Sequence, residues 1–332
     1  MARAATMDRP RGRIVAALAL CAVLATTVGA HAAAPLGGPV RLVVAYPPGG
    51  VSDAIARALA ERAAPQLGTP VIVEHRAGAG GLVAMELLRH APPDGRTLVF
   101  SAVSPLTTAP RPAAAGFDPD TDVTPVMSVM VTPVQVLGTS ALRGDTQAEA
   151  VAMARASPGA VRWATSGVGT TGHRVLEQVR AASGADITHV PYKGGGQQIA
   201  DAVAGEFEVL SSNVGQLQFS YVREGRLKAL AVGAPTRLDV LPGVPTLSEA
   251  GFPGANLSST FGLFAPGRTP PQIIALLNRA FDAALRDPAI QRRLSEAGSV
   301  STGGTTASFA EQIARDRAAA RSGGGGVEPP AR

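Results

Sequence analysis

The sequence predicts an α/β protein, and two observations support that fold class. Short apolar runs alternate with stretches in which apolar residues recur at helical spacing, and loops rich in glycine or proline separate them. This alternation is typical of a parallel or mixed sheet that helices cover on both faces. At 332 residues, the chain is long enough for about two domains with sizeable cores.

The N-terminal segment has the layout of a cleavable secretory signal peptide. Arginines precede an apolar run that begins at Ile14, and Ala30-His31-Ala32 forms a small-x-small cleavage site. We therefore expect residues 1–32 to be removed on export, although a retained membrane anchor would use a similar run. The one cysteine, Cys21, lies inside this segment, and Leu20 before it is atypical of a lipid-attachment site. The mature chain is then expected to contain no thiol or disulfide.

The basic charge of the chain lies largely in this segment. The formal net charge is +5, and residues 1–32 hold four arginines and Asp8, a net +3, which leaves +2 for the mature chain. Aromatic residues make up 4% of the sequence. A basic stripe and stacking aromatics are the usual marks of a nucleic-acid surface, so we expect no nucleic-acid partner.

The elements follow in order along the chain. The first region predicts strands at 40–46, 70–75 and 96–102 and helices at 52–64 and 81–91. Pro65 and Gly68 are predicted to end the helix that begins at 52. From 104 to 124 the pattern dissolves, which indicates a crossing between domains. The second region predicts helices at 146–157, 171–184 and 195–206, strands at 161–166, 187–192 and 207–213, and two amphipathic helices within 269–298.

The loop after the first strand, "YPPGGVSD", leaves backbone open to a ligand. Its two prolines end the hydrogen-bonded ladder, and Gly49 and Gly50 let the main chain approach a bound molecule closely. Free amides at the start of the following helix favour an anion, whereas an ordinary tight turn would use the same residues. Ser52 or Asp53 can cap the helix. We expect Asp53 to be a structural cap that faces away from the anion.

Two further loops repeat this arrangement. "EHRAGAGGL" follows a strand and contains Gly80, and "ATSGVGTTGH" combines glycines with three hydroxyl side chains. Together the three loops favour a carboxylate or phosphate held by amides and hydroxyls. His173 either points a donor into this site or is structural, and Tyr192 and Asn213 stand at strand ends where they could line it.

Motifs for other chemistry do not fit. A Walker loop is absent, Val83 occupies the third glycine position of a dinucleotide fingerprint, and Ser166 lacks the G-x-S-x-G setting. The histidines outside the signal segment have no H-E-x-x-H spacing. We therefore expect no catalytic residue, no metal and no cofactor.

Seven stretches occur in an order that resembles one known family. They are "VVAYPPGGVSDAIAR", "VIVEHRAGAGG", "PPDGRTLVF", "SPGAVRWATSGVGTTGH", "THVPYKGGGQQIADAVAGE", "GRLKALAV" and "LPGVPTLSEAGFPG". The chain resembles the Bug-type solute receptors, the extracytoplasmic binding proteins of tripartite tricarboxylate transporters, from about Val40 to Gly298.

The resemblance implies a two-lobed periplasmic-binding-protein fold of type II, with a ligand cleft between the lobes. Residues 33–103 and 228–332 would form one lobe, and residues 104–227 the other. The implied protein is a monomeric periplasmic receptor that captures a small carboxylated organic acid for the membrane subunits of the transporter. The implied ligand-binding residues are Tyr46, Pro48, Gly49, Gly50, Val51, Ser52, Asp53, Gly80, Ser166, Gly167, Gly169, Thr170, Thr171, His173, Tyr192 and Asn213.

Three departures from the family pattern stand out. His75 replaces the usual asparagine, "KGGGQQ" carries additional glycine, and the tail from Arg315 lacks the apolar residues expected in the last helix. We expect that tail to be a frayed terminus, because its four consecutive glycines disfavour a helix. Two other functions stay open: a receptor that signals to a membrane sensor kinase, and an exported enzyme, for which the chain offers no nucleophile–base pair.

Overall fold

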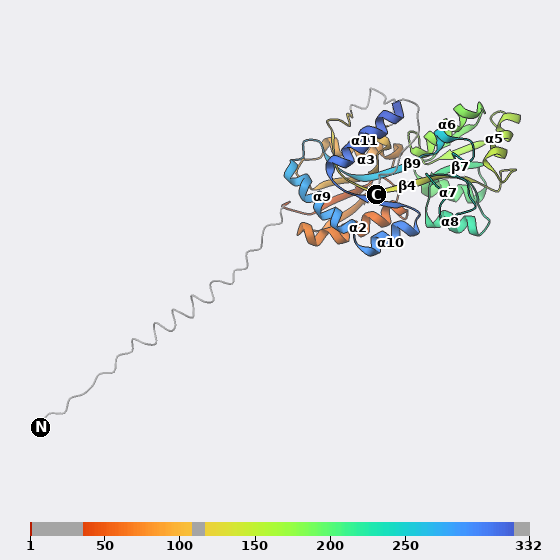
Figure 1. The fold of residues 1–332 in the computed structure, drawn as a ribbon. Helices are drawn as coiled ribbons and strands as arrows, with labels where there is room; N and C mark the ends of the chain where they lie inside the picture. The colour runs from red at the N-terminus through yellow and green to blue at the C-terminus, as the bar shows by residue number, and fades with distance from the viewer. Residues whose placement is uncertain (2–35, 108–116, 322–332) are drawn as a thin grey trace.

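The computed structural model describes Met1, residues 36–107 and residues 117–321. These residues form two α/β lobes, and strand β4 (Val123–Gly138) runs from one into the other (Figure 1). The predicted signal peptide lies outside the described residues from position 2 onward. Within the described ranges, no helix has the length and apolar character needed to cross a bilayer.

The first lobe is built on a mixed sheet with the strand order β2-β1-β3-β9-β4, to which β10 adds by pairing with β4. Strand β1 pairs in parallel with β2 and β3, whereas β9 is antiparallel to both β3 and β4. The strands are β1 (Val40–Val44), β2 (Val71–His75), β3 (Thr97–Ala102), β9 (Ser258–Pro266) and β10 (Val300–Gly303). The helices are α2 (Val51–Leu67), α3 (Leu82–His90), α4 (Ser104–Thr107), α9 (Pro271–Leu285), α10 (Pro288–Glu296) and α11 (Thr306–Arg321), with a short 3-10 turn η1 (Ala79–Gly81) before α3.

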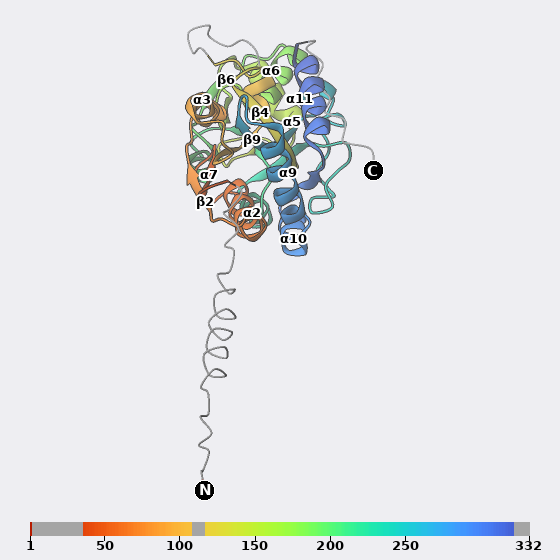
Figure 2. The same ribbon diagram turned by 90° about the vertical axis from the view of Figure 1, so that its left-hand side faces the viewer.

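Helix α2 illustrates how the sequence forms this lobe. Ile55 and Leu59 are fully buried on one face with several alanines, and α2 packs beside α9 and α10 (Figure 2). Pro65 was predicted to end the helix but lies inside its last turn. The helix ends at Gly68, whose φ of 64° is left-handed and whose amide caps the last carbonyls.

The second lobe contains a parallel sheet in which β5 (Arg162–Thr165) lies between β6 (Thr188–Pro191) and β7 (Val209–Asn213). Its core surrounds Trp163, which is fully buried and donates its indole N–H to the hydroxyl of Ser211 over 3.0 Å. The helices are α5 (Gln147–Ala156), α6 (Thr171–Ser183), α7 (Gly195–Ala204) and α8 (Gln216–Arg223), followed by β8 (Lys228–Gly233) and the 3-10 turn η3 (Pro253–Ala255).

The strand pairing supports crossings between the lobes that come later in the chain than the sequence predicts. Residues 123–133 of β4 pair with β9 in the first sheet, and residues 134–138 pair with β7 and β8 in the second. Strand β8, predicted to begin the return at 228, therefore belongs with the second sheet, and Leu257 still packs in the core around Trp163. We propose lobes of residues 36–133 with 258–321, and of residues 134–257, in place of boundaries at 104 and 228.

Pro133 and Ser258 lie opposite each other at these two crossings, and the amide of Val134 donates to the carbonyl of Leu257 over 3.3 Å. The connection between the lobes is thus a pair of adjacent strand segments. Helix α11 completes the first lobe, with Phe309 and Ile313 buried against it. It remains helical to Arg321, beyond the start of the tail predicted to fray at Arg315, and residues 322–332 lie outside the described part of the chain.

Candidate functional site

The loop between β1 and α2 presents exposed backbone, as the sequence predicts. Pro48, Gly49 and Gly50 are exposed, and a Cβ on either glycine would meet no other atom within 4 Å. Gly49 has a φ of 90°, which favours glycine. Val51 and Ser52 are half-buried in the first turn of α2, where helix amides lack intrahelical partners.

Asp53 faces back into this loop rather than capping α2 in the usual way. The N-cap of α2 is Gly50, and no side chain bonds to it. The buried carboxylate of Asp53 accepts the Gly49 amide over 2.9 Å, and it lies 2.8 Å from both the His75 ring and the Arg57 guanidinium. Burial raises the pKa of Asp53, but the Gly49 amide, His75 and Arg57 more than offset it and bring the pKa below its usual value. The carboxylate therefore holds the loop in shape, and His75 is one of its partners.

The side chain of Tyr46 packs and hydrogen-bonds inside the first lobe. Its ring packs edge-on against Phe261, and its hydroxyl accepts the backbone N–H of Ala102 over 3.0 Å. Burial raises the pKa of Tyr46 above its usual value. The side chain thus ties the end of β1 to the end of β3, and both strands point their carboxyl ends toward the second lobe.

Glycines of the two lobes meet where these loops face each other. A Cβ on Gly80 would lie 2.9 Å from the carbonyl oxygen of Val168, and one on Gly167 would lie 3.4 Å from the amide nitrogen of Gly80. A Cβ on Gly194 would lie 2.9 Å from the Pro47 ring. We call this contact region, formed by residues 46–53 and 78–81 of one lobe and 165–171 and 192–196 of the other, the inter-lobe seam.

The loop of residues 165–171 is held by its own polar groups. Thr170 is the N-cap of α6: its hydroxyl accepts the His173 amide over 3.3 Å and donates to the Gly167 carbonyl over 2.8 Å. Ser166 is half-buried, Gly169 has a φ of 78° with open space beside it, and Thr171 begins the helix.

Two stacked histidines lie under this loop. The rings of His173 and His189 are 4.4 Å apart, and Nδ1 of His173 accepts the Gly169 amide over 3.2 Å. His189 lies 2.7 Å from the hydroxyl of Thr165. Burial, aided by His173 and Arg180, lowers the pKa of His189 to about 4, and burial lowers the pKa of His173 as well. His173 is therefore a neutral acceptor within its own loop in this structure, not a donor pointed outward.

The side chains of Tyr192 and Asn213 are both hydrogen-bonded within the protein. The Tyr192 hydroxyl donates to Asp201 over 2.8 Å, and burial together with that carboxylate raises the pKa of Tyr192 to about 12. The amide oxygen of Asn213 accepts the hydroxyl of Ser259 over 2.7 Å. The polar ends of both side chains are thus already engaged, and Tyr192 faces the seam through its carbonyl oxygen, 3.2 Å from a Cβ on Gly167.

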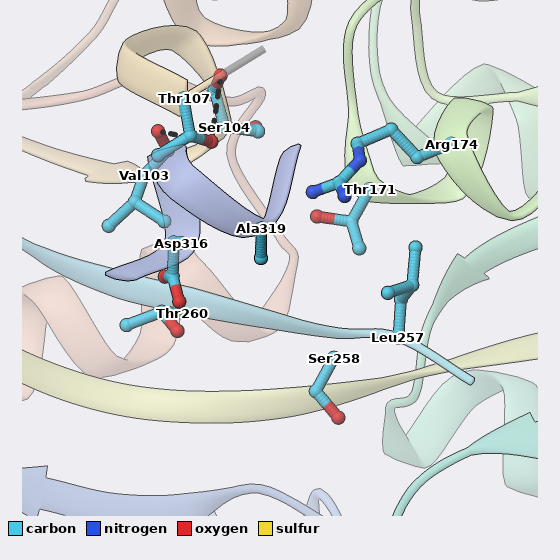
Figure 3. Close-up of a pocket in the computed structure, with 10 residues that line it drawn as sticks. All are labelled: Val103, Ser104, Thr107, Thr171, Arg174, Leu257, Ser258, Thr260, Asp316 and Ala319. Carbon is cyan, nitrogen blue, oxygen red and sulfur yellow. Dashed lines mark hydrogen bonds between the residues drawn. The ribbon is translucent and has the colours of Figure 1, made fainter. Parts of the chain in front are cut away.

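A cavity lies between the lobes, and Thr171 is one of the residues that line it (Figure 3). The space in it that a water-sized molecule can occupy measures about 20 Å³. Thr171 is the one predicted site residue among its lining side chains. The others are Val103, Ser104, Thr107, Arg174, Leu257, Ser258, Thr260, Asp316 and Ala319. Ser104 and Thr107 just after β3, and Arg174 early in α6, follow strand–loop–helix patterns from which the sequence could have indicated them. Thr260 and Asp316 come from distant segments and carry no such signal.

The titratable side chains near the seam have structural partners. No cluster of three or more His, Cys, Asp or Glu side chains suited to a metal ion occurs in this part of the chain. The titratable groups around the seam are instead engaged in holding loops, as Asp53 and His189 are.

Comparisons with known proteins give the family. The family model described as "Tripartite tricarboxylate transporter family receptor" matches residues 55–322. The curated protein BugT of Bordetella pertussis is 33% identical over 266 residues, which cover 78% of this chain and 80% of that protein. A Pseudomonas sp. (strain P51) protein, described as "UPF0065 protein in tcbD-tcbE intergenic region", is 32% identical over 301 residues, covering 89% and 88%.

Solved structures show the same fold. One described as "Structure of a periplasmic transporter" superposes with a TM-score of 0.80 at 34% identity, covering 86% of this chain and 95% of the other. MatC from Rhodopseudomonas palustris with bound malate gives a TM-score of 0.79 at 28% identity, covering 86% and 98%. R. palustris Rpa4515 with adipate gives 0.78 at 29%, covering 86% and 95%. The resemblance and the fold class predicted from the sequence are therefore confirmed: the chain belongs to the receptor family of tripartite tricarboxylate transporters, a family of periplasmic solute-binding proteins.

Proposed function

We propose that this protein captures a small carboxylated organic acid at the inter-lobe seam and delivers it to the membrane subunits of a tripartite tricarboxylate transporter. The family supports the receptor role, and the two relatives that hold malate and adipate support the class of ligand. The observation that carries the proposal is that loops of the two lobes meet at one seam. Gly80 lies against Gly167 there, and Pro47, from the loop that also holds Gly50, lies against Gly194.

The seam suits a carboxylate because its donors are mainly backbone groups. The first-turn amides of α2 and the hydroxyls of Ser166 and Thr171 supply hydrogen bonds without a fixed ion pair. The adjacent crossings at Pro133 and Ser258 would act as the hinge. Closure about it removes water, and each amide-to-carboxylate hydrogen bond strengthens in the drier surroundings.

The remaining parts of the proposal follow from the sequence. Residues 1–32 direct the chain to the periplasm, where the mature protein acts as a monomer without a cofactor. The predicted ligand contacts are the backbone of residues 48–53, Gly80 and residues 166–171. Tyr46, His173, Tyr192 and Asn213 are assigned to shaping these loops, because their polar groups are already hydrogen-bonded within the protein.

Substitution of Gly50 tests the site directly. Its φ of −89° and ψ of 176° are open to any residue, and a Cβ there meets nothing within 4 Å, so Gly50→Val should fold normally. Calorimetric titration with dicarboxylates, tricarboxylates, acidic amino acids and aromatic acids should show binding by the wild type and loss of binding by Gly50→Val. Gly243→Val is the matched control, since Gly243 is exposed on the second lobe with equally open space. Equal affinities for Gly50→Val and wild type would refute the site.

The delivery role needs a separate measurement. The acid-loaded protein, immobilised and incubated with solubilised membranes of its own source, should retain the membrane subunits of a tripartite tricarboxylate transporter, and the acid-free protein should retain less. Recovery of a membrane sensor kinase in place of those subunits would contradict it.

A further inference from the structure

Asp316 carries a carboxyl group that is buried where the two lobes meet. It projects from α11 of the first lobe into the cavity of Figure 3, and it is 6% exposed. The second lobe supplies the opposite wall of this cavity, through Thr171 and Arg174 of α6 and through Leu257. Because these residues cover the carboxyl only while the lobes are together, parting the lobes opens the cavity to water.

The buried carboxyl has few neighbours that stabilise a negative charge. The side-chain amide of Gln312 donates to its Oδ1 over 2.7 Å, and this partner is neutral. Arg174 lines the same cavity without forming an ion pair with it. The space for water in the cavity, about 20 Å³, holds roughly one molecule. A carboxylate that exchanges its hydration in bulk water for these surroundings loses stability, so the closed lobes favour the protonated form.

The cations near Asp316 oppose its protonation without preventing it. Burial raises the pKa of Asp316 to about 6, although Gln312, Arg174 and Arg315 each lower it. Helix α4 and strand β4, which also pack against α11, contain no ionisable side chain. Other charged side chains on α11, on α6 and on neighbouring segments are paired with one another or exposed: Glu311 with Arg315, Asp120 with Arg317, Asp122 with Arg89, Asp282 with Arg286, Glu177 with Arg180, and Arg279.

From this geometry we propose that Asp316 couples closure of the two lobes to the uptake of one proton. In the open protein the carboxyl is hydrated and ionised, whereas in the closed protein it is buried and holds the proton. The ionised group therefore opposes closure, and mild acid removes that opposition. This coupling acts on the lobes themselves and does not depend on which molecule the seam binds, so it goes beyond the proposed function.

The direction and size of the effect follow from the linkage between proton binding and closure. The pKa of Asp316 is about 6 in the closed structure, against about 3.9 for a hydrated aspartate. The contribution to closure is thus fully present below pH 4 and is lost as the pH rises to about 6. Between pH 7 and pH 5, the ratio of closed to open protein should rise by at most about tenfold.

Spin labels on the two lobes measure this ratio in the ligand-free protein. His90→Cys on α3 and Ala181→Cys on α6 place labelling sites at exposed positions on different lobes. The mature chain is expected to contain no other thiol, because Cys21 lies in the signal segment. Double electron–electron resonance at pH 5, 6 and 7 then gives the closed and open populations, and the closed population should grow as the pH falls.

Variants assign the response to Asp316. Asp316→Asn keeps an acceptor for Gln312 but cannot ionise, so at pH 7 it should be as closed as the wild type at pH 5, with little dependence on pH. Arg174→Gln removes a cation that opposes protonation, so it should move the midpoint of the response to higher pH. Glu311→Gln, which removes an exposed carboxylate from the same helix, is the matched control and should behave as the wild type.

His189 would shift closure in the opposite direction if it took part, because its pKa is lowered in this structure. It is present in every variant, so the difference between the wild type and Asp316→Asn isolates Asp316. A ratio that stays constant between pH 7 and pH 5, or that changes equally in folded Asp316→Asn, would overturn the coupling. If calorimetry showed no binding of any organic acid while closure still followed pH through Asp316, the proposed function would fail and the coupling would stand.

Discussion

Gly80 of the first lobe and Val168 of the second are so close that a Cβ on Gly80 would lie 2.9 Å from the Val168 carbonyl oxygen. A real Cβ does not approach a backbone atom this closely. The absence of a side chain at position 80 therefore sets how near the two lobes can come, and with it how completely the seam can close on a ligand.

Gly80→Val should hold the lobes apart. The φ of Gly80 is 65°, so any larger residue adds strain as well as the clash. Gly184→Val is the control for that strain, because Gly184 has a φ of 64° and no atom within 4 Å of a Cβ. Small-angle scattering with a bound acid should show compaction for wild type and Gly184→Val but not for Gly80→Val, whose affinity should fall by tenfold or more. Full compaction of Gly80→Val would contradict this role.

Stability should fall in mild acid because of His189. Its pKa is lowered to about 4 in the folded protein, against about 6.5 when unfolded. The unfolded chain therefore binds more protons between these values, and the free energy of unfolding decreases as the pH falls from about 6.5 to 4. His189→Gln keeps a hydrogen-bonding partner for Thr165 and should flatten this decrease in chemical denaturation at several pH values. An equally steep decrease in the variant would exclude His189 as its source.

Asp316 should have the opposite effect on how stability depends on pH. Burial raises its pKa to about 6, with Gln312, Arg174 and Arg315 offsetting part of the shift. The folded state then holds the extra proton, so its contribution to stability is present below pH 4 and is lost as the pH rises to about 6. Asp316→Asn should therefore gain stability relative to wild type over this range, by at most about 3 kcal/mol. A stability difference independent of pH would count against it.

Helix α11 should be firmly docked. Phe309 is 1% exposed and packs against Phe264 with ring centroids 5.4 Å apart. Phe309→Ala should lower the free energy of unfolding by about 3–5 kcal/mol, the usual loss for a buried phenylalanine. Val300→Ala, at a position that is 62% exposed, should change it by about 0.5 kcal/mol or less. A small effect of Phe309→Ala in urea denaturation would indicate a loosely attached helix.

The sequence predicts local elements well because their signals are local. The apolar run before Pro47 gives β1, and the spacing of Ile55 and Leu59 gives α2. Lobe membership is different, since it depends on pairing between distant segments. Strand β8 joins the second sheet only because its register matches residues 134–138 of β4, and nothing within β8 itself indicates this.

The same division holds for the site. The three loops could be predicted from glycines and hydroxyl residues next to strand ends, because the residues that form a loop are adjacent in the sequence. The roles of individual side chains could not be predicted, because they depend on partners from distant segments. Asp53 accepts the Gly49 amide and also contacts His75, which lies on another strand. Asn213 accepts the hydroxyl of Ser259, on the strand that returns to the first lobe. Arg174 and Asp316 line one cavity only because the two lobes assemble, so this cavity leaves no pattern in the sequence.

A crystal structure of the mature protein with a tightly bound organic acid tests the central claim most directly. We predict density for the acid at the seam, with carboxylate oxygens within hydrogen-bonding distance of amides in residues 49–53, Gly80 or residues 166–171. Density for the acid at any other place on the protein, with these amides hydrogen-bonded to water, would contradict the account.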